Sequence, residues 1–255
     1  MEAIKSKIQS QFSQLEFDEA AHTYKAQGLK YPSVSSHIHN FEEAVNWEEK
    51  AGHVARRDGK TTEQVLGEWK ENNEESTDRG HRVHLFGELY PFNRNLKPFI
   101  MKDGKPCPQE LAVMKFWNDL PAHIIIVSLE IRMFHPLLRY AGTSDILLYN
   151  IKDGTFIIAD YKTNNDLFKN FKGKKLLAPF GHLLDCPLNK YQIQLSLYQI
   201  LFEQTGYKVS QRKIIWLLKE DMVVNKVQYK AGEYVMFDAE DLTDTLRNYL
   251  SKQLN

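Results

Sequence analysis

The chain has 255 residues, 42% of them hydrophobic, which is enough to bury a substantial core as one domain with elaborations. Its 33 basic and 33 acidic side chains give a formal net charge of zero, so binding to nucleic acid would need a local basic patch. Two cysteines are too few for a four-cysteine zinc or iron–sulfur site. The apolar runs are too short to cross a bilayer, and the polar N-terminus does not resemble a signal peptide. We expect a soluble, intracellular protein without a membrane partner.

The N-terminal region is expected to be largely helical. Apolar residues at three- and four-residue spacing predict a helix over residues 1–16, and residues 17–24 could form a strand. After Pro32, Ser33 and Ser35 are candidate N-caps for a helix that would carry Phe41 and Trp47. Residues 58–75 are highly charged and predict a solvated helix.

A second helix is predicted from Thr77 to Tyr90, with Gly80, His84 and Glu88 on one face because they are four residues apart. Glycine inside a helix costs about 1 kcal/mol relative to alanine, so Gly80 suggests a close approach by a neighbouring group. His84 could donate a ring nitrogen to a metal, with Glu88 orienting it or acting as a further ligand. The alternative is an exposed histidine–glutamate pair.

A packing helix is predicted over residues 108–119, followed by a strand over residues 124–133. Glu130 lies within this apolar strand and needs a partner if its face is buried. It either approaches a metal site or projects from an edge strand into solvent.

Two β-rich runs, residues 142–149 and 156–163, flank an Asp-Gly pair and predict a hairpin. A two-residue loop would place Asp145 opposite Lys162 and put Asp160 on the same face, because side chains alternate with period two. An odd-length loop would send Lys162 to the other face.

The two aspartates and the lysine at one end of this hairpin suggest a site for Mg²⁺ or Mn²⁺, which prefer oxygen ligands. Lys162 would then steady a nucleophilic water or a developing phosphate charge. The alternative interpretation is a surface cluster of ion pairs.

A lysine-rich, aromatic segment follows the hairpin. Basic and aromatic residues alternate there in the way expected of a groove for single-stranded nucleic acid. A solvated lysine loop packed down by its phenylalanines would look the same. The residues concerned are Phe168, Lys169, Phe171, Lys172, Lys174, Lys175 and Phe180.

The last third of the chain predicts a helix capped by Asn189 and ended by Gly206, with Gln194 and Tyr198 on one face. A core strand over residues 213–218, a hairpin over residues 227–237 and a closing helix over residues 238–254 complete the predicted elements.

Four motifs in this order resemble those of the PD-(D/E)XK nuclease superfamily, specifically its RecB-like branch. The motifs are Gly80-His81-Arg82-Val83-His84, Gly142-Thr143-Ser144-Asp145, Asp160-Tyr161-Lys162 and Gln194-Leu195-Ser196-Leu197-Tyr198. A looser likeness to phage-encoded and mitochondrial genome-maintenance exonucleases rests on His22-Thr23-Tyr24 and Tyr31-Pro32-Ser33-Val34-Ser35.

The resemblance implies an α/β fold with a mixed central sheet flanked by helices, and it assigns roles to single residues. Asp145 and Asp160 would bind the metal with His84, and Lys162 would orient or activate water. Further expected ligands are the Tyr161 carbonyl and Glu130. Gln194 and Tyr198 would point at the active site or the DNA backbone. Ser33 and Ser35 would touch a DNA phosphate, unless they only cap their helix.

The expected function is a Mg²⁺- or Mn²⁺-dependent DNA exonuclease that acts from a free single-stranded end. Alternatives are a structure-specific endonuclease and a non-catalytic DNA-binding module with the same fold. We expect one nuclease domain: an N-terminal helical elaboration (1–76), a catalytic core (77–220) and a C-terminal hairpin and helix (221–255). The expected location is the cytoplasm of a bacterial or phage-infected cell, or the mitochondrial matrix after removal of a transit peptide.

Overall fold

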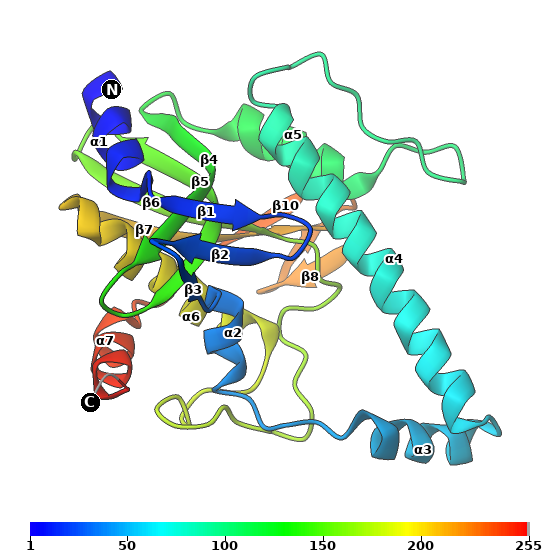
Figure 1. The fold of residues 1–255 in the computed structure, drawn as a ribbon. Helices are drawn as coiled ribbons and strands as arrows, with labels where there is room; N and C mark the ends of the chain where they lie inside the picture. Colours follow the sequence, from blue (N-terminus) through cyan, green and yellow to red (C-terminus); the bar gives the residue numbers. More distant parts are fainter. Residues whose placement is uncertain (254–255) are drawn as a thin grey trace.

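The computed structural model describes residues 1–253, and its centre is a mixed five-stranded sheet flanked by helices (Figure 1). The sheet has the strand order β10-β7-β6-β5-β4; only β6 and β7 are parallel among its neighbours. Its strands are β4 (Ile124–His135), β5 (Tyr140–Asn150), β6 (Thr155–Lys162), β7 (Val209–Leu217) and β10 (Tyr234–Asp238). The mixed α/β architecture expected from the sequence is confirmed.

Two hydrophobic cores cover the two faces of this sheet. One contains buried residues of α1 (Glu2–Phe12), α2 (Val34–His39), α6 (Pro187–Phe202) and α7 (Thr243–Lys252). The other contains α4 (Thr62–Leu89) and α5 (Pro108–Asp119). Successive strand residues alternate between the cores: Leu147 and Ile158 belong to the first, Ile146 and Ile157 to the second. Residues at the ends of β5 and β6 can therefore be reached from helices on both faces.

The β5–β6 hairpin forms as predicted, but its register differs from the prediction. Asn150 pairs with Thr155, so the loop has four residues, and the ladder runs to Ile146 opposite Ala159. Continued by one residue, this register places Asp145 opposite Asp160, where the two-residue loop had placed Lys162. Asn150 and Asp153 side chains hold the longer turn through mutual and backbone hydrogen bonds. The shift is even, so the predicted face of each side chain is unchanged.

The N-terminal region is less helical than predicted. Helix α1 ends at Phe12, and a small sheet follows, made of β1 (Leu15–Asp18), β2 (Thr23–Ala26) and β3 (Leu29–Tyr31). The helix expected around Phe41 is split into α2 and α3 (Trp47–Asp58), and Phe41 lies between them. Ser33 caps α2 by accepting a hydrogen bond from the Ser36 amide.

Helix α4 unites the two helices predicted over residues 58–75 and 77–90 into a single element of 28 residues. It begins with a capping box between Thr61 and Gln64 and runs without interruption past residue 76, where the expected N-terminal elaboration meets the catalytic core. Its N-terminal half packs on α3 through a small separate core, and the pair extends from the body as an arm (Figure 1).

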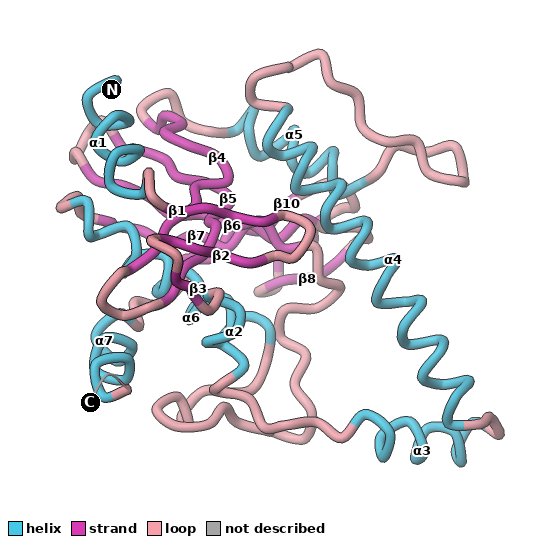
Figure 2. The backbone as a smooth tube through the Cα atoms, in the orientation of Figure 1, coloured by secondary structure: helices cyan, strands magenta, loops and turns pink. Residues whose placement is uncertain are grey.

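Helix α5 spans residues 108–119, as predicted, while the C-terminal elements differ. Helix α6 begins at Pro187, so Asn189 is not its cap; a 3-10 turn, η1 (Glu203–Thr205), precedes Gly206. The predicted hairpin of residues 227–237 is divided: β8 (Met222–Val224) pairs with β9 (Val227–Tyr229), and β10 joins the main sheet. Of the predicted helix over residues 238–254, residue 254 lies outside the described range. Long loop segments follow α4 and link β6 to α6 (Figure 2).

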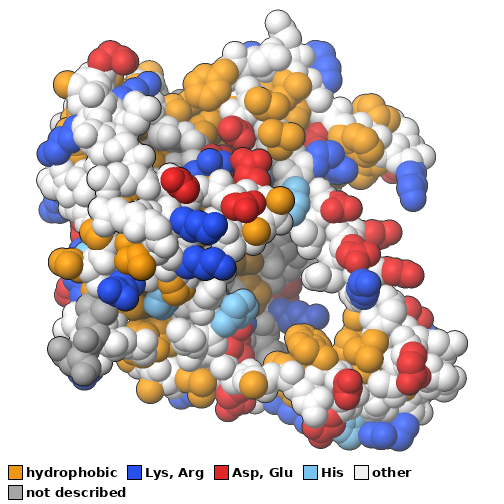
Figure 3. All heavy atoms as spheres, in the orientation of Figure 1, with side chains coloured by type: hydrophobic (Ala, Val, Ile, Leu, Met, Phe, Trp, Pro, Cys, Tyr) orange, Lys and Arg blue, Asp and Glu red, His pale blue; other side chains and the backbone are white. Residues whose placement is uncertain are grey.

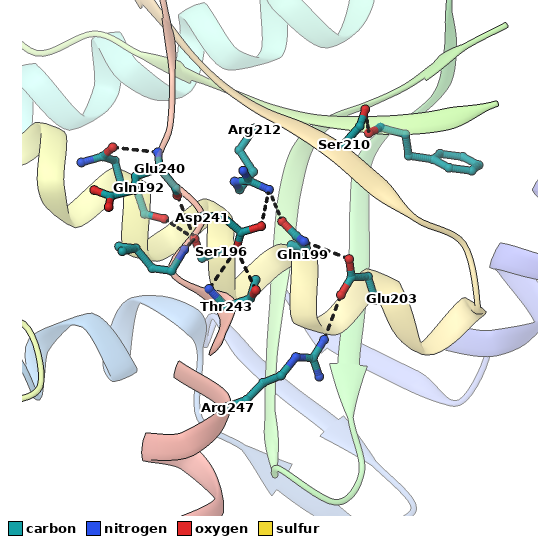
Figure 4. Close-up of polar contacts among 12 residues, drawn as sticks. Gln192, Ser196, Gln199, Glu203, Ser210, Arg212, Glu240, Asp241, Thr243 and Arg247 are labelled. Carbon is teal, nitrogen blue, oxygen red and sulfur yellow. Dashed lines mark hydrogen bonds and ion pairs between the residues drawn. The ribbon is translucent and has the colours of Figure 1, made fainter. Parts of the chain in front are cut away.

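A polar seam fixes α6 against the C-terminal segment and Arg212 of β7 (Figure 4). Ser196 donates to the Glu240 carbonyl and accepts from the Leu242 amide. Gln199 accepts from Arg212, which also contacts Asp241 at 3.2 Å. These contacts of Ser196, Gln199 and the Arg212 Nη1 atom can hold α6 in one orientation, although the buried Arg212 Nε atom has no hydrogen-bond partner among residues 1–253.

Close packing of α4 on β6 depends on Gly87. A Cβ atom there would lie 2.5 Å from Cε2 of the buried Tyr161 ring, closer than van der Waals contact allows. At Gly80, for which the sequence suggested a close approach, the nearest atom would be Thr163 Oγ1 at an ordinary 3.6 Å. Gly87, which no motif marked, is therefore the glycine that sets the distance between helix and strand.

We predict opposite effects of alanine at these two glycines. Gly87→Ala should lower the free energy of unfolding by about 1 to 3 kcal/mol, since it overpacks the Tyr161 ring. Gly80→Ala should leave it unchanged or raise it by up to about 1 kcal/mol through helix propensity. Denaturant unfolding of both variants measures this, and wild-type stability of Gly87→Ala would contradict the packing.

Candidate metal centre

Three acidic residues form a row across neighbouring strands at one end of the sheet. The β4–β5 ladder pairs Leu129 with Ile146 and Ile131 with Ser144, so Glu130 lies opposite Asp145. The β5–β6 register places Asp145 opposite Asp160. Directly opposed like charges destabilise a sheet, so this row requires compensating cations.

Glu130 lies in β4 with φ +49, a left-handed conformation that is unusual for a non-glycine residue within a strand. It breaks the alternation of faces, because Leu129 contacts one core and Ile131 belongs to the other. Such strain is concentrated at functional sites, where the surrounding structure holds it.

His84 reaches this row from α4. Its Nδ1 atom lies 3.1 Å from Asp145 Oδ2, and the same carboxylate oxygen accepts the Tyr161 backbone amide at 2.9 Å. The imidazole also meets the Tyr161 ring edge-on, with centroids 5.9 Å apart. Helix α4 thus positions His84 through the packing that Gly87 permits.

Lys162 reaches the row from the end of β6, and α6 holds its side chain. Its ammonium contacts Asp160, donates to Gln194 Oε1 at 3.0 Å and lies 4.0 Å from the Tyr191 ring centroid. Gln194 in turn donates to the Tyr198 hydroxyl at 3.1 Å. The chain Lys162–Gln194–Tyr198 brings the predicted Asp-x-Lys and Gln-x-x-x-Tyr residues together.

The crowded charges perturb each other strongly. Burial, reinforced by the Asp145 charge, raises the pKa of Glu130 to about 8 and that of Asp160 to about 6. Burial alone would raise the pKa of Asp145, but the charges of His84 and Lys162 outweigh it and lower that pKa. Burial opposes a charged His84, yet the Asp145 carboxylate prevails and raises its pKa to about 9.

His84, Glu130 and Asp145 are arranged so that they could share one cation. One potential ligand atom from each residue lies within 4.8 Å of the other two. Two carboxylates and an imidazole suit a divalent metal, and the elevated Glu130 pKa indicates a carboxylate whose charge lacks compensation. Asp160 is not in this group because its side chain faces Lys162, so its role as a ligand, like that of the Tyr161 carbonyl, stays a prediction.

The row opens into a cleft of about 1300 Å³. Figure 3 shows this face hollowed between the body and α4. One wall is α4, including Arg79, His84 and Glu88; other walls are the β1–β2 hairpin and residues 163–166, with Lys169 beyond them. This volume exceeds the roughly 300 to 1000 Å³ of typical small-molecule pockets. The cleft is large enough for a polymer.

None of the seven residues predicted to contact nucleic acid lines the cleft: Ser33, Ser35, Lys172, Lys174, Lys175, Gln194 and Tyr198. The hydroxyl of Ser33 is occupied as a helix cap. The ammonium of Lys174 lies 3.4 Å from both Glu43 and Asp185. These lysines therefore do not form the predicted groove at this site, although the same segment supplies Lys169.

Two polar cleft residues, Tyr191 and Arg79, had no role assigned from the sequence. Tyr191 underlies the Lys162 ammonium, and its position three residues before Gln194 on a predicted helix was an available signal. Arg79 lines the cleft from α4, and no sequence motif marked it.

Comparison of the chain with models of known protein families and with curated proteins finds no match. Within residues 1–253, no helix is long and apolar enough to span a bilayer. The candidate function therefore rests on the residues of the site.

We predict that the metal-free protein is destabilised by the Glu130 charge. The folded-state pKa of Glu130, about 8, lies above the ordinary value of 4.5. The contribution of Glu130 to the free energy of unfolding is therefore most favourable below about pH 4.5, and it is lost as the pH rises through 8 and the side chain becomes charged. The melting temperature of Glu130→Gln minus that of wild type should grow between pH 5 and pH 8 in EDTA.

The control is Glu2→Gln on the exposed first turn of α1. In saturating Mn²⁺ the wild type should have the higher melting temperature. Its Glu130 carboxylate can bind the ion, whereas the amide of Glu130→Gln is a poor ligand. A pH-independent difference in EDTA would contradict the assigned electrostatics.

Proposed function

We propose that this protein is a metal-dependent deoxyribonuclease of the PD-(D/E)XK type, acting as an exonuclease on DNA with a single-stranded end. The observation that carries the proposal is the convergence of His84, Glu130, Asp145, Asp160 and Lys162 at one end of a mixed sheet beside an open cleft. Residues of all four nuclease-like motifs meet here.

The residues fit the hydrolysis of a phosphodiester. Bound Mg²⁺ or Mn²⁺ would supply positive charge to the phosphoryl oxygens and promote deprotonation of the attacking water. His84, Glu130 and Asp145 would hold the ion. Asp160, paired with Lys162, would be a further ligand. Lys162, held by Asp160 and Gln194, would offer a fixed ammonium to the charge that develops at phosphorus.

The need for a free end is supported by how the chain closes around the cleft. Helix α4 forms one wall and residues 163–166 form another. These walls are joined beyond the cleft by α3 and residues 40–46, where the Leu177 amide donates to the Phe41 carbonyl at 2.8 Å. Lys174 pairs with Glu43 and Lys190 with Glu42 in the same region. A strand enclosed in this way enters most readily by its end.

Single substitutions test the chemistry. Asp145→Asn, Asp160→Asn and Lys162→Ala should each reduce hydrolysis of end-labelled DNA by about a thousandfold or more, because each removes transition-state charge stabilisation. Asp153→Asn, at the other end of the same hairpin, is the matched control and should keep activity. Near wild-type turnover in any well-folded site variant would remove that residue from the mechanism.

A closed substrate separates the exonuclease from the endonuclease alternative. With Mn²⁺, linear single-stranded DNA should be degraded, while a covalently closed circle of the same sequence should survive. Linearising that circle should restore degradation by the same protein preparation. Rapid cutting of the closed circle would assign the site to an endonuclease.

A further inference from the structure

An exposed apolar stripe leads away from the cleft along the end of α4. Leu85 lines the cleft and is 54% exposed; Leu89, one turn later, is 46% exposed, and Phe92 is 74% exposed. Their spacing of four and three residues puts them in one line on the helix and its continuation. Figure 3 shows hydrophobic side chains gathered at the upper right, over this end of α4 and the segment after it.

The segment after α4, residues 91–107, is basic although the whole chain is neutral. It contains Arg94, Lys97, Lys102 and Lys105 against a single acid, Asp103, for a net charge of 4 − 1 = +3. All four basic residues are exposed. Phe99 and Ile100, which lie between them in sequence, are 49% and 58% exposed.

A buried carboxylate holds this segment against α4. Glu110, which is 1% exposed, accepts from the Phe99 amide at 2.5 Å and from Arg82 Nε at 3.0 Å. The Arg82 guanidinium also lies 4.2 Å from the Phe99 ring centroid. Arg82 is two residues before His84, so the anchor fixes the segment to the turn of α4 that carries the metal-site histidine.

The tip of the segment is itself ordered. Ile100 bridges Pro106, and the Met101 amide donates to the Lys105 carbonyl at 2.8 Å. Gly104 takes a positive φ of 78 in this turn. The backbone that carries Lys102 and Lys105 is thus ordered before binding, which lowers the entropy lost on binding.

We propose that residues 91–107, together with Leu85 and Leu89, form a second binding surface for single-stranded nucleic acid, continuous with the cleft. This inference rests on the proposed function and extends it, because it assigns a path to the part of the strand outside the cleft. Phe92 and Phe99 offer ring faces to unpaired bases, and the four basic side chains meet the phosphates.

Charge favours a nucleic acid over a protein as the occupant. Single-stranded nucleic acid combines negative phosphates with bases that can stack, and this surface combines positive side chains with exposed aromatic rings. Stacking that tolerates any base sequence requires no shaped pocket. A second copy of the chain would bring the same positive charge to the interface and repel it.

Binding of labelled oligonucleotides by fluorescence anisotropy tests this, with every protein carrying Asp145→Asn and in EDTA so that no DNA is consumed. Two lengths are compared: about 6 nucleotides, enough for the cleft, and about 20, enough to reach the segment. The variants are Phe92→Ala and the pair Lys102→Gln with Lys105→Gln. The control pair, Lys152→Gln with Lys208→Gln, removes the same charge at exposed sites near the opposite end of β5 and β6.

Phe92→Ala should weaken binding of the longer oligonucleotide about tenfold and leave the short one unchanged. The Lys102/Lys105 pair should lower the slope of log affinity against log salt by about 0.7 per lysine on the longer oligonucleotide. The control pair should change neither. Wild-type affinity in both segment variants, or loss of self-association in Phe92→Ala with oligonucleotide binding intact, would overturn the inference.

Failure of the proposed function would look different. Lack of cleavage by the wild-type protein with Mn²⁺ counts against the nuclease assignment alone, because the anisotropy measurements involve no turnover. Full nuclease activity with unaltered binding by the segment variants counts against the second surface alone.

Discussion

Mutual repulsion among Glu130, Asp145 and Asp160 is the constraint on which the site depends. The registers of β4, β5 and β6 place the three carboxylates side by side at one end of the sheet. Two cations from the chain offset part of this charge: His84 pairs with Asp145 and Lys162 with Asp160. Burial, reinforced by the charge that remains, raises the pKa of Glu130 to about 8. A divalent ion is the simplest group that would compensate this charge.

The architecture delivers those cations from opposite faces of the sheet. Helix α4 brings His84 over one face, at a distance set by Gly87 against Tyr161. Helix α6 brings Gln194 over the other face, where it holds the Lys162 ammonium, and the polar seam keeps it in place (Figure 4). The end of a sheet covered on both faces is a position where residues distant in sequence can meet beside the cleft.

The sequence predicted which residues lie together at the end of the hairpin better than it predicted the boundaries of the elements. The Asp-Gly turn and period-two alternation put Asp145, Asp160 and Lys162 on one face, and that result survived a wrong register because the error was an even number of residues. The strained conformation of Glu130 could not be predicted, since a positive φ in a strand has no local sequence signal. Nor could the pairing of Lys174 with Glu43, which depends on two segments 131 residues apart in sequence meeting in the fold.

Locating a metal ion directly is the sharpest test of this account. Crystals of the protein grown or soaked with Mn²⁺ should show an anomalous scattering peak at about 2.1 Å from ligand atoms of His84, Glu130 and Asp145. The same peak should disappear in Asp145→Asn crystals prepared in the same way. A strong Mn²⁺ peak elsewhere with none at this row, or binding unaffected by Asp145→Asn, would contradict the central claim that these residues form a metal centre.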